Sequence, residues 1–160
     1  MVERSGGGDD PTRHAWSVRA RGAEGGREVR VYAGRHAFSV GRQASFSRDE
    51  PHPSAVEYLL GALAADLVDG YRRHAAERGA EVASIEAVAS GELENPMVHL
   101  GVVGSEGRPG LGSVTAILYV SSEAGDATLQ DAWRATLATS PLVSTIGRSA
   151  RLSLELRTVP

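Results

Sequence analysis

The chain has 160 residues and a formal net charge of −3, with 41% hydrophobic and 23% charged residues. This length predicts one domain with its own hydrophobic core. All 17 basic residues are arginine, and they form no basic stripe, so we expect no nucleic-acid partner. The chain contains no cysteine, which excludes disulfides, cysteine-ligated metals and thiol chemistry within it.

The N-terminal segment differs in composition from the rest of the chain. Residues 1–13 are polar and rich in glycine, which predicts a disordered tail ahead of a single domain over residues 14–160. The tail lacks the apolar segment of a secretory signal, and no apolar run reaches the roughly 18–20 residues of a membrane span. We therefore expect a cytoplasmic protein with no membrane contact.

Strand patterns dominate the N-terminal third after the tail. Apolar and polar residues alternate in three segments separated by glycines, which predicts an antiparallel meander. The predicted strands cover residues 15–21, 28–34 and 36–41.

A long helix is predicted next, over about residues 55–78. Ser54 is placed to cap it, Glu57 falls in its first turn, and Gly79 follows its end. The first half of this helix is apolar on all faces apart from Asp66. A chain of this size rarely buries such a helix completely, so the pattern favours a dimer in which the helix lies at the shared core.

The second half of the chain mixes strands and helices. Ser140 followed by Pro141 is a typical helix start. The predicted elements are strands over 81–93, 97–104 and 113–122, a helix over 127–139, a helix from 141 and a strand over 151–157. The resulting order, β-β-β-α-β-β-β-α-α-β, indicates an α+β fold.

Several familiar motifs are missing. The segment GRPGLGS lacks the lysine of a phosphate-binding loop and opens no helix, so it predicts a turn. No histidine has a histidine partner four residues away, and we expect neither a metal nor a cofactor. His99 alternates with apolar residues and is interpreted as a structural or pocket residue, while Trp16 and Trp133 are expected in the core.

The segment PSAVEYLLGALAAD, residues 53–66, resembles the helix-opening motif of the OsmC/Ohr family, the osmotically induced and organic-hydroperoxide-resistance proteins. The family pattern is close to Pro-Ser-Pro-x-Glu-x-Leu-Leu-x-Ala-Leu-x-x-Cys, and Asp66 falls on its cysteine. The segment ATSPLVSTI, residues 138–146, resembles a second family motif in which Ser140 falls on another cysteine. The resemblance covers roughly residues 28–157 and implies an intertwined homodimer with the central helices buried.

In that family the first cysteine attacks a peroxide and the second closes a disulfide with it, while an arginine stabilises the thiolate. A carboxylate at Asp66 and a hydroxyl at Ser140 cannot perform this chemistry, so the resemblance implies a member without thiol-peroxidase activity. A buried carboxylate requires a partner. Arg35 and Arg30 on the N-terminal strands are the candidate partners of Asp66.

Three hypotheses remain open. In the first, the site binds a small hydrophobic ligand at the dimer interface, with Glu57, Asp66, Ser140 and Arg35 as candidate contacts and a stress-related role implied by the family. In the second, the protein is a non-redox enzyme that uses Asp66 as general acid or base. In the third, Asp66 is a satisfied structural residue and the pocket is a relic of a hydroperoxide reductase. Ser140 and Glu57 also have simple structural interpretations as helix-capping residues.

Overall fold

We describe the fold from a computed structural model that covers residues 14–22, 28–41 and 50–160. The predicted tail over residues 1–13 lies outside these residues. Within them, no helix is long and apolar enough to cross a membrane. The elements are β1 (Arg19–Gly22), β2 (Val29–Ala33), β3 (His36–Val40), α1 (Ala55–Ala76), β4 (Ser84–Leu93), α2 (Pro96–His99), β5 (Leu111–Ser121), α3 (Asp126–Thr139), α4 (Pro141–Ile146) and β6 (Arg151–Thr158).

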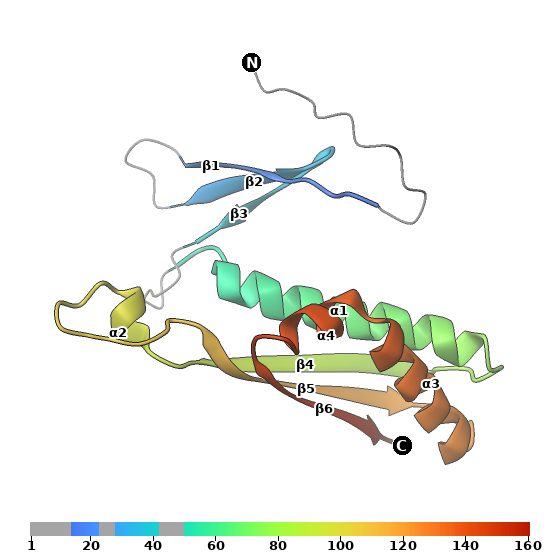
Figure 1. The fold of residues 1–160 in the computed structure, drawn as a ribbon. Helices are drawn as coiled ribbons and strands as arrows, with labels where there is room; N and C mark the ends of the chain where they lie inside the picture. The colour runs from blue at the N-terminus through green and yellow to red at the C-terminus, as the bar shows by residue number, and fades with distance from the viewer. Residues whose placement is uncertain (1–13, 23–27, 42–49) are drawn as a thin grey trace.

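The structure has two three-stranded sheets (Figure 1). The N-terminal sheet is the predicted antiparallel meander β1-β2-β3. In the C-terminal sheet, β5 lies between β4, to which it is antiparallel, and β6, to which it is parallel. The α+β class is therefore confirmed, although the parallel pairing of β6 had no signal in the sequence.

The core lies between the C-terminal sheet and the helices that cover one of its faces (Figure 1). Alternate residues of β5 point into it, because successive side chains of a strand face opposite sides. The residues with the least exposure come from α1, β5 and α3, and they include Leu63, Leu67, Tyr71, Leu118 and Leu129. Trp133 belongs to this core, as predicted.

Two sequence predictions are wrong. The segment over residues 97–104 is not a strand: it contains α2 and turns in which Gly101 and Gly104 adopt positive φ angles. Asn95 accepts a hydrogen bond from the Val98 backbone N–H and Pro96 occupies the first turn, so helix-start chemistry overrides the apolar pattern. His99 consequently lies exposed on α2 rather than in a strand. The observed order is β-β-β-α-β-α-β-α-α-β.

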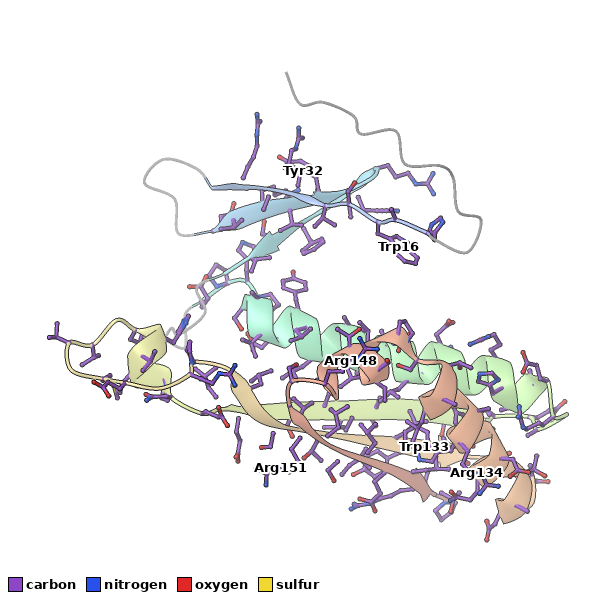
Figure 2. The ribbon with its side chains drawn as sticks, in the orientation of Figure 1. Trp16, Tyr32, Trp133, Arg134, Arg148 and Arg151 are labelled. Carbon is purple, nitrogen blue, oxygen red and sulfur yellow. The ribbon has the colours of Figure 1, made fainter. Side chains whose placement is uncertain are left out.

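The second error concerns Trp16, which is 82% exposed instead of buried. It precedes β1 and lies on the side of the N-terminal sheet that faces the helices (Figure 2). The nearest aromatic contact of Trp16 is the ring of His14, 4.6 Å away between centroids. The apolar ring of Trp16 is therefore left largely uncovered by the residues that the structure describes.

Candidate functional site

The candidate site begins at the N-terminus of α1, where Ser54 and Glu57 form a capping box. The Glu57 backbone N–H donates to Ser54 Oγ at 3.3 Å, and the Ser54 backbone N–H donates to Glu57 Oε2 at 2.7 Å. This second bond is the main reason why the pKa of Glu57 lies below its ordinary value. Both residues have the capping role that the sequence predicts, and the carboxylate of Glu57 is committed to it.

Asp66 lies 2.5 turns further along α1, on the border between its buried and its exposed face. The residues one position before and after it illustrate this border, because Leu67 is fully buried whereas Ala65 is exposed. The half-buried carboxylate of Asp66 accepts a hydrogen bond from the hydroxyl of Ser140. Among the described residues, Asp66 forms no ion pair.

Ser140 lies at the junction of α3 and α4 and is only 6% exposed. The chain turns there because Ser140 is in an extended conformation and Pro141 starts the next helix. Besides donating to Asp66, the Ser140 hydroxyl accepts a hydrogen bond from the Val143 backbone N–H at 2.9 Å. One hydroxyl thus caps α4 and fixes the junction against the middle of α1.

The two arginines that we considered as partners of Asp66 lie elsewhere within the chain. Arg35 is exposed in the turn between β2 and β3. Arg30 donates to Ser39 Oγ on the neighbouring strand at 3.0 Å. The structure therefore brings Asp66 and Ser140 together, leaves Glu57 at the helix start, and places Arg35 in none of these contacts.

A second polar cluster joins α1 to α3, and sequence analysis missed it. His74 is 7% exposed, with Nδ1 2.9 Å from Glu77 Oε2 and Nε2 2.9 Å from Thr139 Oγ1. The hydrogen bond to His74 is the largest cause of the lowered pKa of Glu77. Because Thr139 directly precedes Ser140, this cluster holds the same junction from its other side.

We also searched the described residues for groups of side chains that could hold a metal ion. Over residues 14–22, 28–41 and 50–160, no group of three or more histidine, aspartate or glutamate side chains is arranged to hold a metal ion. The donors at the candidate site are one carboxylate and one hydroxyl, which already bond to each other.

The fold is similar to those of solved proteins, although comparisons of the sequence find no relative. No protein-family model matches the sequence, and no curated protein matches it. Solved structures do match: an OsmC-like protein from Mycoplasma pneumoniae has a TM-score of 0.76 at 12% identity, with 92% of this chain and 99% of that chain covered. An OsmC-like protein of unknown function from Vibrio cholerae has a TM-score of 0.70 at 10% identity, with 92% and 100% covered.

The similarity extends to a hydroperoxide-resistance protein. The organic hydroperoxide resistance protein OhrB of Bacillus subtilis has a TM-score of 0.60 at 18% identity, with 90% of this chain and 98% of that chain covered. The chain therefore has the fold of the OsmC-like and Ohr proteins over nearly its whole length. This confirms at the level of the fold the resemblance that the two sequence motifs carry.

Proposed function

We propose that this chain is a cysteine-free relative of the OsmC/Ohr proteins that binds a small hydrophobic molecule at a homodimer interface and has no thiol-peroxidase activity. One observation carries the proposal. Asp66 and Ser140 are 74 positions apart in sequence, yet they share a hydrogen bond. In the resemblance these two positions are the two redox cysteines, which must approach each other to form a disulfide.

The loss of thiol chemistry follows from the side chains themselves. Peroxide reduction by a thiolate transfers an oxygen atom to sulfur and leaves a sulfenic acid, which a second thiol converts to a disulfide. The chain has no cysteine at either position, since Asp66 and Ser140 stand there. Neither a carboxylate nor a hydroxyl accepts the oxygen atom, so the arrangement persists without the reaction.

Two apolar surfaces that are largely exposed in the single chain support the homodimer, although Phe38 in the first of them packs against Tyr58 of α1. In the N-terminal sheet, β-strand pairing puts Ala20, Val31 and Phe38 on one face, and Trp16 and Val18 extend the same alternation. Val18 is 68% exposed and Trp16 even more so. The opposite face carries Arg19, Arg30 and Tyr32 and is polar in character, as Figure 2 shows for Tyr32. An apolar face of this kind is typical of an interface.

The second surface is the exposed side of α1. Leu59, Gly61, Ala62 and Ala65 lie there, all exposed in the single chain. These small and apolar residues allow the close approach of another chain, and their burial in a dimer would account for a helix that is apolar on all faces. Asp66 borders this surface, so a pocket at the interface would have the Asp66–Ser140 pair as its polar group.

The enzyme hypothesis has less support from the same geometry. A carboxylate that accepts a hydroxyl proton has the arrangement of a base and a nucleophile. However, the conjugate acid of a carboxylate is far stronger than an alcohol, so Asp66 could not hold the proton of Ser140 without further help. Ser140 is also committed to capping α4. The contact is better suited to holding a polar group in place than to activating it.

The experiment first measures oligomeric state by light scattering after size-exclusion chromatography. We expect a dimer for the native chain and a monomer for Ala65→Arg, whereas Ala127→Arg on the exposed side of α3 serves as the matched control and remains a dimer. A monomeric native chain would refute the homodimer.

Ligand binding is then tested separately with the fluorescent probe 1-anilinonaphthalene-8-sulfonate and its displacement by decanoic acid. We expect saturable binding that Ala62→Trp abolishes by filling the interface pocket and that Ala127→Trp leaves unchanged. A dimer that binds neither probe nor fatty acid would refute the binding role and leave Asp66–Ser140 as a structural relic.

A further inference from the structure

A cavity at one end of the C-terminal sheet is lined by two arginines and by neither Asp66 nor Ser140. It has a volume of about 560 Å³. One wall is the connection between β4 and β5, with Glu94 and Arg108, and the other is the connection between α4 and β6, with Arg148 and Ser149. Figure 2 shows Arg148 beside α4, on the helix side of the sheet, whereas Arg151 points away from the opposite face.

The topology explains why these two distant segments meet. The parallel pairing of β5 and β6 matches Ser113 with Arg151, so the residues that precede each strand lie at the same end of the sheet. Arg108 precedes β5 and Arg148 precedes β6. The cavity is therefore fixed by the strand register rather than by a chance approach of two loops.

The wall that contains Arg108 is anchored on both sides. The Glu94 backbone N–H donates to the Gly110 carbonyl at 2.9 Å, and Asn95 Nδ2 donates to the Glu106 carbonyl at 2.8 Å. Gly107 has a φ of +122°, a conformation that glycine adopts without strain. The turn is thus held at its two ends, which keeps Arg108 in the cavity wall.

The one acidic residue of the cavity, Glu94, offsets only one of its two positive charges. The Glu94 side chain lies over Gly112, where an added Cβ atom would come within 2.7 Å of Glu94 Oε1. Neither Arg108 nor Arg148 forms an ion pair with Glu94 or with any other of the described residues. Two guanidinium groups and one carboxylate leave the cavity with a net positive charge, which raises the local concentration of anions.

We propose that Arg108, Arg148 and Ser149 form a binding site for the phosphate group of a small molecule. Guanidinium groups donate paired N–H bonds that match the oxygens of phosphate, and the serine hydroxyl can bond a further oxygen. The Ser149 hydroxyl also donates to the Ile146 carbonyl at 3.2 Å, which holds it at the end of α4. The site is independent of the ligand proposed for the dimer interface.

The test is a titration of the full chain with inorganic phosphate, glycerol 3-phosphate and glycerol at constant ionic strength, followed by the arginine Nε–H signals in NMR. We expect saturable shifts with both phosphates and none with glycerol. Tighter binding of glycerol 3-phosphate assigns the site to a phosphate ester, whereas equal binding assigns it to the free ion.

Variants separate the site from general attraction of anions. Arg108→Gln and Arg148→Gln are each expected to weaken phosphate binding at least about tenfold, the value of one lost charge-assisted hydrogen bond. Arg108→Lys keeps the charge without the paired N–H geometry and should bind with intermediate affinity. Arg134→Gln, an exposed arginine on α3, is the matched control and should bind as the native chain does. Absence of saturable shifts, or equal loss in the Arg134 variant, would overturn the proposal.

Discussion

Replacing Ser140 with alanine removes two hydrogen bonds through the loss of one atom. The Val143 N–H at the start of α4 loses its cap, which costs about 1 kcal/mol. The Asp66 carboxylate loses the hydrogen bond that the Ser140 hydroxyl donates to it. Because Asp66 is half-buried, this loss costs about 1–2 kcal/mol, below the range for fully buried charged groups. We therefore expect Ser140→Ala to lower the free energy of unfolding by about 2–3 kcal/mol.

A double-mutant cycle isolates the contact between the two residues. Urea unfolding is measured for the native chain, Ser140→Ala, Asp66→Ala and the double variant at one fixed protein concentration, because dimers unfold at concentration-dependent midpoints. We expect a coupling energy of about 1 kcal/mol, with Ser144→Ala on the exposed side of α4 as a control that changes little. Strictly additive single effects would refute the contact, and with it the central arrangement of the site.

The remaining predictions concern the ends of α1. The pKa of Glu57 is lower in the folded chain than in the unfolded chain. Its contribution to stability is therefore complete above the unfolded pKa, about 4.3, and is lost as the pH falls through the folded value. We expect Glu57→Gln to flatten the acid side of the curve of stability against pH, as measured by urea midpoints. Thr139→Val leaves Nε2 of buried His74 without its partner and should cost about 1–2 kcal/mol in the same assay. Gly79→Ala should cost about 1 kcal/mol in thermal unfolding, because Gly79 has a φ of +70°.

Each of these predictions has an outcome that contradicts it. An unchanged acid limb in Glu57→Gln would mean that the capping box does not form. A neutral Thr139→Val would place His74 in contact with water, and Thr145→Val on the exposed face of α4 provides the matched loss of a hydroxyl. Stabilisation by Gly79→Ala would mean that the turn after α1 has a different backbone conformation.

The sequence predicts the elements best where local chemistry and the apolar pattern agree. Ser54 with Glu57, and Ser140 with Pro141, each give a helix start that the structure confirms. At residues 97–104 the two signals disagree. The apolar alternation predicts a strand, whereas Asn95 followed by Pro96 is a helix start, and the chain follows the helix start. The capping residue Asn95 is therefore the better predictor of the short helix α2 than the alternation of apolar residues.

Contacts between residues far apart in the sequence are harder to predict from local patterns. The meeting of Asp66 with Ser140 depends on how the junction of α3 and α4 lies across α1, which no local pattern encodes; only the resemblance suggested it. The same holds for Arg108, whose segment predicts a turn and nothing more, because its companion Arg148 arrives through the parallel pairing of β6. Trp16 shows a different limit: its apolar character predicts burial, yet it is 82% exposed in the part of the chain that the structure describes.

We propose that Asp66 and Ser140 occupy the positions at which the OsmC/Ohr resemblance has its two redox cysteines, so that their contact is kept without the sulfur chemistry. The most direct test measures consumption of tert-butyl hydroperoxide with a dithiol reductant, for the native chain and for the double variant Asp66→Cys with Ser140→Cys. We predict that the native chain is inert and that the double variant turns over. Peroxide consumption by the native chain, or a double variant that remains inert although folded, would contradict this account.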